Sequence, residues 1–386
     1  MPVERVHERV KIMDGARNST RCLTLLSQLL LGLEERTSSG SNVGQAPRRD
    51  CTDEIVETVA AFGPQDFGEL WGLAASHHVV MRAFPGLYRV MLTGGNEWAE
   101  AVDHAMEQEK ARIVHALSFL SPICSALQDA GSVIVIKSLD HWPDLGSDLD
   151  LYSSAESADV VAIMRERFKA HLEERSWGDR LANKWNFVVR GLPELVEVHV
   201  GRLGQTGEQV AITDSLITRA RTAQLGGYTF PVPAPEDRLI LTTLQRMYRH
   251  FYLRLCDVVD TAGLVESGAI DYAYLKSLAR SAGLWDGLAT YLVTVSGYVK
   301  SYRGADLPLP SLVTDAAQFG NELVSFRRKF LRIPIFPQAA KLYASEWKRL
   351  LLNGELQSAL RLSLLPGLAA AAALEFKFTG TDKGIW

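Results

Sequence analysis

Hydrophobic positions recur at two different spacings along the chain, and the change between them predicts a strand-containing centre between regions of helix. Over residues 19–36 and from about 53 to 130, apolar positions repeat every three or four residues, as in a helix with one buried face. Gly131 ends the second segment. From Pro233 onward the pattern is again helical almost throughout. Residues 37–50 are polar and rich in Gly, Ser and Pro, which is typical of a mobile linker.

Four short segments between the two helical regions have the patterns of strands. A β-branched apolar run at 132–138 predicts a strand that is buried on both faces. Alternation at 148–153 and 195–200 predicts strands with one apolar and one polar face, and a further strand is expected at 186–190. Residues 155–175 have the period of a helix. The order helix, strand, strand, helix, strand, strand predicts an α+β fold with a small mixed sheet of about four or five strands.

The chain has 386 residues, which is long enough for two or three domains with cores of their own. We expect an N-terminal helix with a mobile linker, a helical region, a core that contains the sheet and a C-terminal helical domain. Their predicted bounds are 1–52, 53–104, 105–215 and 216–386.

Composition and charge narrow the class of protein. A formal net charge of −4 argues against a protein that coats nucleic acid, although a local basic groove stays possible. The four cysteines show no CxxC spacing, which is typical of reduced thiols rather than of a zinc site or a disulfide framework. The charged N-terminus is unlike a signal peptide, and the apolar stretch 362–374 is too short to span a bilayer. We therefore expect a soluble cytoplasmic protein in which 362–374 forms a pair of core helices.

Three aspartates, a Gly-Ser pair and alternating leucines lie together in the stretch DLGSDLDLY, residues 144–152. Because successive side chains of a strand point to opposite faces, Asp148 and Asp150 share one face while Leu149 points to the other. Two carboxylates one strand step apart repel each other and resist burial unless a cation lies between them. The pattern thus raises the question of a bound metal ion.

A later segment, LVEVHVG, supplies a third carboxylate. Glu197 and His199 alternate with valines and so lie together on the polar face of their strand. Three converging carboxylates suit Mg²⁺, and the preceding Gly146 and Ser147 offer N–H groups and a hydroxyl to a triphosphate. We expect the three carboxylates to lie within one ion's reach on an exposed sheet edge. At least one aspartate should have a raised pKa before metal binds, because like charges are crowded there.

These residues resemble the signature of the DNA-polymerase-β-like nucleotidyltransferases: Gly146, Ser147, Asp148, Asp150 and, on a later strand, Glu197. More narrowly, IKSLDHWPDLGSDLDLY with VEVHVG and the helical segment 233–260 is similar to a group of uncharacterised bacterial nucleotidyltransferases. In that group a lysine, here Lys137, ends the first strand. The resemblance covers roughly residues 70–265. One departure is Glu197, since the third acid of the family is often Asp.

The resemblance implies a Mg²⁺-dependent enzyme that transfers an NMP from an NTP, with ATP as the expected donor, and releases pyrophosphate. Two Mg²⁺ ions are implied, with Mn²⁺ as a substitute, and Asp148 and Asp150 would bridge them. Glu197 would complete the metal shell and accept the proton of the nucleophile. The acceptor is a small molecule, an RNA end or a protein, and neither a membrane nor an extended nucleic-acid surface is expected as a partner.

Nucleotide contacts are expected from Gly146, Ser147 and Lys137, and from a basic stripe on the helix after Pro235. Arg246, His250 and Arg254 are four residues apart and form this stripe, with Asp257 three residues further on. The stripe is either a solvated face or a set of phosphate contacts. Arg249, on a neighbouring line of the helix, is a weaker candidate.

Other polar residues are interpreted as structural. Asp140, His141 and Asp144 are assigned to turns and helix caps, and His77 and His78 to structural roles. Two further hypotheses remain beside the enzyme: an inactive nucleotide-binding or regulatory module of the same fold, and a structural helical protein in which the acidic motif is accidental.

Overall fold

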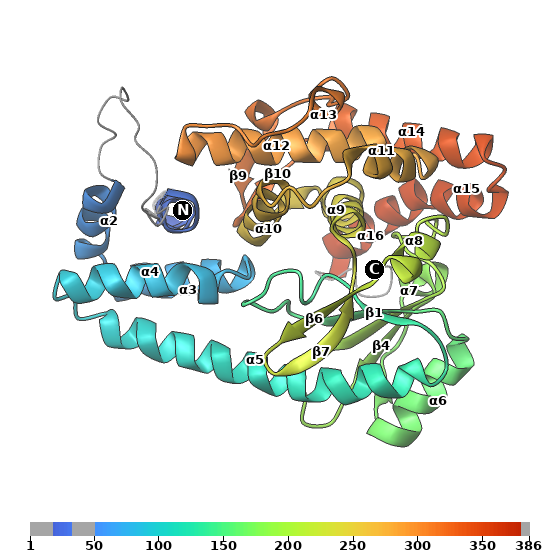
Figure 1. The fold of residues 1–386 in the computed structure, drawn as a ribbon, viewed down its shortest axis with the longest axis horizontal. Helices are drawn as coiled ribbons and strands as arrows, with labels where there is room; N and C mark the ends of the chain where they lie inside the picture. Colours follow the sequence, from blue (N-terminus) through green and yellow to red (C-terminus); the bar gives the residue numbers. More distant parts are fainter. Residues whose placement is uncertain (1–17, 33–50, 380–386) are drawn as a thin grey trace.

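The structure, a computed structural model, describes residues 18–32 and 51–379. A five-stranded mixed sheet lies on one side of this part of the chain, and helices from both halves of the sequence lie beside and above it (Figure 1). This arrangement confirms the predicted α+β fold with a small sheet and flanking helices.

The sheet is formed by the segments predicted as strands, with one short addition. Its strands are β1 (Val133–Val135), β2 (Leu149–Ser153), β3 (His171–Leu172), β4 (Lys184–Val188) and β5 (Val196–Val200). They lie in the order β1-β2-β5-β4-β3, and β2 and β5 are parallel while the other neighbours are antiparallel. The four predicted strands are confirmed to within a few residues.

The register of β2 and β5 decides which side chains meet. Asp150 is paired with Glu197 across the two strands, so both carboxylates project from the same face. The leucines and valines of the opposite face are buried with residues of α5 (Ala99–Gln128) and α6 (Ser157–Phe168). Burial of this apolar face fixes the register, because a slip by one residue would turn the carboxylates into the core.

Helices of the N-terminal half lie along the sheet and beside it. Residues 18–27 are helical and continue into the π-helical η1 (Gln28–Gly32), followed by α2 (Cys51–Ala60), α3 (Pro64–Ser76), α4 (Val80–Thr93) and α5. The helix predicted at 19–36 is confirmed as far as residue 32. Its last residues and the linker predicted at 37–50 lie outside the described residues.

The helix predicted at 155–175 is too long. Helix α6 ends at Phe168 because Lys169 takes a left-handed conformation with φ of 51°, and the chain then pairs with β4 as β3. A short helix, α7 (Trp177–Ala182), follows and is capped by Ser176, whose hydroxyl accepts a hydrogen bond from the Asp179 N–H. The sequence analysis missed both elements.

The C-terminal half is also less uniformly helical than predicted. It contains α8 (Thr213–Thr218), the hairpin of β6 (Arg221–Leu225) and β7 (Tyr228–Val232), α9 (Pro235–Thr243), η2 (Leu244–His250), β8 (Tyr252–Leu253), α10 (Leu255–Glu266), α11 (Tyr272–Ser281) and α12 (Trp285–Arg303). It continues through α13 (Ser311–Thr314), η3 (Asn321–Leu323), β9 (Ser325–Arg327), β10 (Phe330–Arg332), η4 (Ile335–Ala339), α14 (Ala340–Leu352), α15 (Leu356–Ser363) and α16 (Leu365–Thr379).

One break matters for the site. The helix expected to run on from Pro235 stops at His250, because Phe251 adopts a φ of 54° and the next two residues pair with β10. The partner strand lies some eighty residues further along the chain, so a local helical period gave no sign of it. The basic stripe predicted on one continuous helix is therefore divided between η2 and α10, and that part of the prediction was wrong.

Hydrophobic side chains of the described residues gather in two main clusters. One joins the helices of the N-terminal half to α9–α12, and the other lies between the sheet, α5 and the β6–β7 hairpin. The two ends of the sequence thus share a core, while the domain bounds given above stay a prediction.

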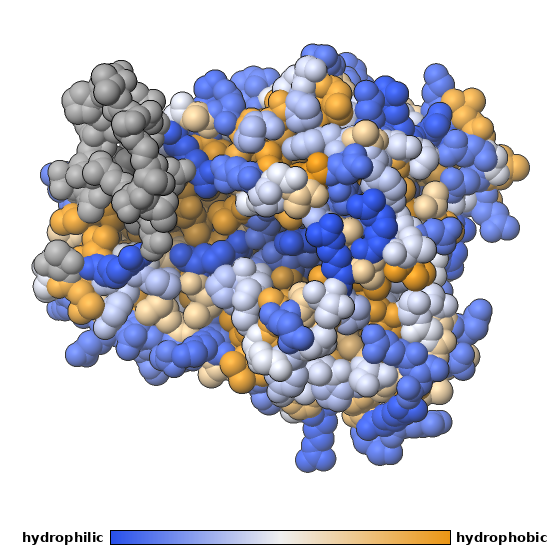
Figure 2. Space-filling model, in the orientation of Figure 1, coloured by the Kyte–Doolittle hydropathy of each residue, from blue (hydrophilic) through white to orange (hydrophobic). Residues whose placement is uncertain are grey.

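The apolar stretch 362–374 forms the end of α15 and most of α16. Leu362 and Ala372 are buried, but Leu364 and Leu374 are exposed, so the prediction of a core helix pair is only partly right. Figure 2 shows apolar side chains at the surface where α14 and α15 form one end of the molecule. None of the described helices is long and apolar enough to cross a membrane.

Candidate active site

The polar face of β2 and β5 carries a compact group of acidic and imidazole side chains. One ligand atom from each of Asp150, Glu197 and His199 lies within 4.8 Å of the others. The His199 Nε2 is 2.8 Å from the Glu197 Oε1. The carboxylates are only 14% and 13% exposed, and both β2 and β5 lie inside the sheet with a strand on each side. The site therefore lies on the face of two central strands, and the predicted exposed sheet edge was wrong.

Two lysines neutralise these carboxylates. The Lys137 Nζ lies 2.5 Å from an Asp150 oxygen and 3.6 Å from a Glu197 oxygen. Lys137 follows β1 with a φ of 60°, and this left-handed turn directs its side chain over β2. The Lys184 Nζ lies 2.9 Å from the other Glu197 oxygen and 2.9 Å from Asp179. Sequence reasoning found the first lysine and missed the second.

Lys184 could not be recognised without the sheet. It is the first residue of β4 and is paired with His199 across the antiparallel strands. Its segment, KWNFV, has a lysine at the edge of an apolar run, which is usually a solvated strand end. Only the strand order places it beside β5.

The charges at the site follow from these contacts. Burial alone would raise the pKa of Glu197, but Lys184, Lys137 and the hydrogen bond with His199 hold that pKa well below its usual range. Burial, with the nearby charges of Asp150 and Glu197, raises the pKa of Asp148 to about 6. The prediction that at least one aspartate has a raised pKa is confirmed. The carboxylate of Glu197 is thus charged at neutral pH and is a weak base.

Asp148 lies just before β2, beyond the group of three. Among the described residues, Asp148 does not belong to the group whose ligand atoms all lie within 4.8 Å of one another. The turn that holds it is tied to the end of β1 by Ser138, whose hydroxyl donates to the Asp148 carbonyl at 2.8 Å and accepts from the Asp150 N–H at 2.7 Å. The Gly146 N–H also donates to the Ser138 carbonyl, and Ser147 is exposed. Ser138 is a positioning residue that sequence reasoning missed.

The donor set suits a hard divalent cation. Carboxylate oxygens are the ligands that Mg²⁺ prefers, and those of Asp150 and Glu197 are drawn together by two neighbouring ammonium groups. The residues whose ligand atoms lie together and could hold such an ion are Asp150, Glu197 and His199, and Asp148 lies just before the same strand. The Nδ1 of His199 is buried and has no hydrogen-bond partner among the described residues.

The predicted basic stripe is not a solvated face. Arg246 is completely buried, and its Nε lies 2.7 Å from an Asp257 oxygen. The Arg254 guanidinium lies 2.6 Å from the His78 Nε2. Burial, with the charges of surrounding cations, lowers the pKa of His250 to about 2, so its ring is neutral. None of these three basic residues lies in the acidic group of Asp150, Glu197 and His199.

Arg249, the weaker candidate, lies beside the acidic group. It lines a small hollow together with His199, Lys184 and Asp179. Its charge also contributes to the pKa values of Lys184 and His250. The Arg249 guanidinium adds a positive charge beside Lys184 at this end of the group, and a guanidinium is a suitable partner for a phosphate.

The residues assigned to turns and caps form a buried ion-pair network. Asp144 accepts a hydrogen bond from the Met81 N–H at 2.7 Å and pairs with Arg82, which also pairs with Asp260. The His141 Nδ1 lies 2.5 Å from the second Asp260 oxygen. Asp144 thus caps the start of α4, as expected for a capping residue.

Asp140 and His77, which the sequence also indicated as structural residues, make contacts that hold elements together. Asp140 pairs with Arg238 at 2.9 Å. His77 accepts a hydrogen bond from the Leu255 N–H and lies 2.7 Å from the Lys329 carbonyl, which ties α3 to α10 and to the β9–β10 turn.

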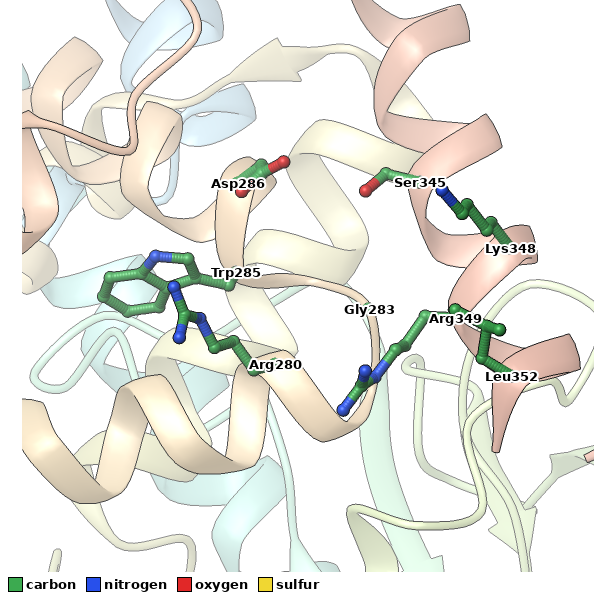
Figure 3. Close-up of a pocket in the computed structure, with 8 residues that line it drawn as sticks. All are labelled: Arg280, Gly283, Trp285, Asp286, Ser345, Lys348, Arg349 and Leu352. Atoms are coloured by element: carbon green, nitrogen blue, oxygen red, sulfur yellow. The ribbon is translucent and has the colours of Figure 1, made fainter. Parts of the chain in front are cut away.

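A separate hollow of about 400 Å³ lies between the start of α12 and α14 (Figure 3). Arg280, Trp285 and Asp286 form one wall, and Lys348 and Arg349 belong to the helix opposite. It shares no lining residue with the acidic group and is a separate feature of the surface.

Comparison with known proteins gives one family. Residues 145–297 match the profile of a family described as uncharacterised nucleotidyltransferase. The match supports nucleotidyl transfer as the class of reaction. It begins just before Gly146 and extends through α10 into α12, so it includes both acid-bearing strands. No curated protein and no solved structure shows significant similarity to the chain.

Proposed function

We propose that this protein is a Mg²⁺-dependent nucleotidyltransferase that transfers an NMP, with ATP as donor, to an acceptor hydroxyl. The observation that carries the proposal is the pairing of Asp150 with Glu197 on the polar face of two parallel strands, directly after Gly146 and Ser147. The similarity of residues 145–297 to nucleotidyltransferases supports the same reaction class.

In this reaction the acceptor oxygen forms a bond to the α-phosphorus, and the bond from that phosphorus to the bridging oxygen of pyrophosphate breaks. Mg²⁺ held by Asp148, Asp150 and Glu197 would supply Lewis-acid stabilisation of the phosphate charge. Ser147, which is exposed at this turn, would bind the leaving phosphates through its N–H and hydroxyl groups, and Gly146 would hold the turn in place.

The remaining side chains of the site hold charge and protons. Lys184 is paired with both Glu197 and Asp179 and offsets part of their negative charge. Lys137 lies between the carboxylates and is available to a phosphate oxygen. The proton of the acceptor hydroxyl passes to Asp148 or to water, because Glu197 is held as a much weaker base.

A second candidate function follows from the same lysines. Lys137 and Lys184 already compensate the charges of Asp150 and Glu197, as expected in a module that binds nucleotide without metal-dependent turnover. The two functions differ in whether pyrophosphate is released.

The test is pyrophosphate release from each α-labelled NTP in the presence of Mg²⁺ and a cell extract that supplies the acceptor. Asp150→Asn should lower release by roughly a thousandfold or more, because one anionic ligand is lost at the point where phosphate charge develops. Asp103→Asn, an exposed change on α5, is the matched control and should behave as wild type. A thermal melt of each variant should show an intact fold.

Wild-type turnover by the Asp150 variant would overturn the assignment of the metal site. An NTP that binds to the wild-type protein without any release of pyrophosphate would instead support the regulatory module.

A further inference from the structure

A hollow of about 380 Å³ lies beyond the acidic group, between η2 and the C-terminal helices. Aliphatic and aromatic side chains dominate its walls. They are Leu244, Phe251, Ile335, Phe336, Leu362, Leu365 and Pro366, with Ala339, Ala340 and Ala369. Ile335 and Phe336 are 62% and 83% exposed, so part of this apolar wall is open to solvent. Apolar walls of this extent are typical of a site that binds a small organic molecule.

The apolar hollow is next to the acidic site. Gln205 and Arg249 line it, and both also line the small hollow that contains His199 and Lys184. A molecule with one end among the apolar side chains can therefore present its other end to the strand face that carries the carboxylates.

Polar groups in the wall argue against a phosphate at this position. Glu208 and Glu346 are both buried in it. Glu346 accepts a hydrogen bond from the Gln209 amide at 2.6 Å, and burial raises the pKa of both carboxyls. A triphosphate placed beside them would meet carboxyls that already resist a negative charge.

The direction of the chain places this hollow opposite the expected triphosphate. Gly146 and Ser147 precede β2, whereas Gln205 follows β5, and the two strands are parallel. The two features therefore lie at opposite ends of the strand pair, with Asp150 and Glu197 between them. In an in-line displacement the nucleophile approaches the phosphorus from the side opposite to the leaving group. The side of Gln205 is thus the side of the acceptor.

We propose that the acceptor is a small amphipathic molecule whose apolar group occupies this hollow and whose hydroxyl lies near Arg249. The inference rests on the proposed function and adds the class of acceptor. It favours a small molecule over an RNA end, because Arg249 is the single cation among the described lining residues and two of the polar groups there are buried carboxyls, which do not suit a phosphate backbone.

The first experiment measures occupation of the hollow with the fluorescent probe anilinonaphthalene sulfonate. Ala369→Trp adds an indole to the lining and should weaken probe binding by about tenfold. Ala370→Trp is the matched control, since the next residue on α16 is exposed, lies outside the lining and points about 100° away. It should keep wild-type affinity, as should Asp150→Asn. Equal losses in the two Trp variants, or displacement of the probe by Mg-ATP, would overturn the proposal.

The second experiment follows the acceptor itself. Wild-type protein is incubated with Mg²⁺, α-labelled ATP and the small-molecule fraction of a cell extract, and the products are partitioned between water and butanol. We expect label in the butanol phase, at least tenfold less with Ala369→Trp and no loss with Ala370→Trp.

The two proposals fail in different ways. Label on a product that stays in water, and that Ala369→Trp does not reduce, would overturn the amphipathic acceptor and leave the transferase intact. No labelled product with any NTP would overturn the transferase, and with it the acceptor, whatever the probe shows.

Discussion

At the scale of single residues, burial decides the role of a charge more than its position in a motif. Arg246 belongs to a basic stripe in the sequence, yet it is fully enclosed and paired with Asp257. Lys184 has no place in any motif, yet it lies against Glu197. A buried ion needs a partner of opposite charge, and the tertiary structure determines which residue that partner is.

Arg246→Ala should lower the free energy of unfolding by about 3–5 kcal/mol, because it leaves the buried Asp257 carboxylate without its counterion. Urea denaturation measures this loss. Replacing both partners, as Arg246→Met with Asp257→Leu, should recover much of it. A stable Arg246→Ala protein with weakened NTP binding would instead restore Arg246 as a nucleotide contact.

The buried carboxyls of the apolar hollow predict a pH dependence of stability. The pKa of Glu346 is well above its usual value, so the folded protein binds this proton more tightly than the unfolded chain does. Stability from this group is complete below the unfolded pKa of about 4.5 and is lost as the pH rises towards the folded pKa.

Between pH 5 and pH 8 the wild-type protein should therefore lose about 1 kcal/mol or more of stability that Glu346→Gln keeps. The amide oxygen still accepts from Gln209. Thermal melts at the two pH values measure the difference, and an identical fall with pH in both proteins would show that other groups cause it.

At the scale of elements, single residues in left-handed conformation set where strands and helices end. Lys169 ends α6, Phe251 separates η2 from β8, and Lys137 lies in the turn just after β1. Each turn directs the following segment to a partner that a straight continuation would miss. In the last case the turn also places an ammonium group over Asp150.

The turn at Lys137 predicts an order of stability between two variants. Both Lys137→Ala and Lys137→Gly lose the ammonium group, but only glycine adopts positive φ without steric cost. Lys137→Gly should be more stable than Lys137→Ala by about 1 kcal/mol in urea denaturation. The reverse order, as glycine gives in an ordinary strand, would show that this backbone conformation is not maintained in solution.

At the scale of the whole molecule, the helices of the two ends share one core. Leu25 and Leu26 are completely buried in the cluster that includes α12. The hydroxyls of Ser27 and Tyr298 lie 2.8 Å apart, and Arg303 on α12 donates to the Leu31 carbonyl. The N-terminal helix thus stabilises the helices that lie above the sheet.

Leu25→Ala should cost about 2–5 kcal/mol, because a large side chain is removed from a closely packed core. Urea denaturation followed by far-ultraviolet circular dichroism measures the loss. The pyrophosphate release of the folded fraction should stay unchanged, since the apolar face of the acid-bearing strands β2 and β5 packs in the other cluster. A cost below about 0.5 kcal/mol would show that the N-terminal helix folds apart from the rest.

Local patterns in the sequence were sufficient to predict where the strands lie and which acidic residues share a strand face. Alternation with a period of two placed Asp148 and Asp150 on one face of a strand and Glu197 with His199 on another, and the structure keeps these strands within a few residues. The pattern also determined the helices that precede and follow the sheet. Such inferences succeed because side-chain direction and burial along one strand depend on neighbours in sequence.

The tertiary structure alone decided what surrounds the acids. The parallel pairing of β2 with β5 opposes Asp150 and Glu197, and the antiparallel β4 brings Lys184 to them. The pairing of β8 with β10 ended the helix that was expected to carry the basic stripe, and the packing of η2 beside α14–α16 produced the apolar hollow. Each of these contacts joins residues far apart in the chain, and their free energy comes from burial and hydrogen bonds formed only when the distant segments meet.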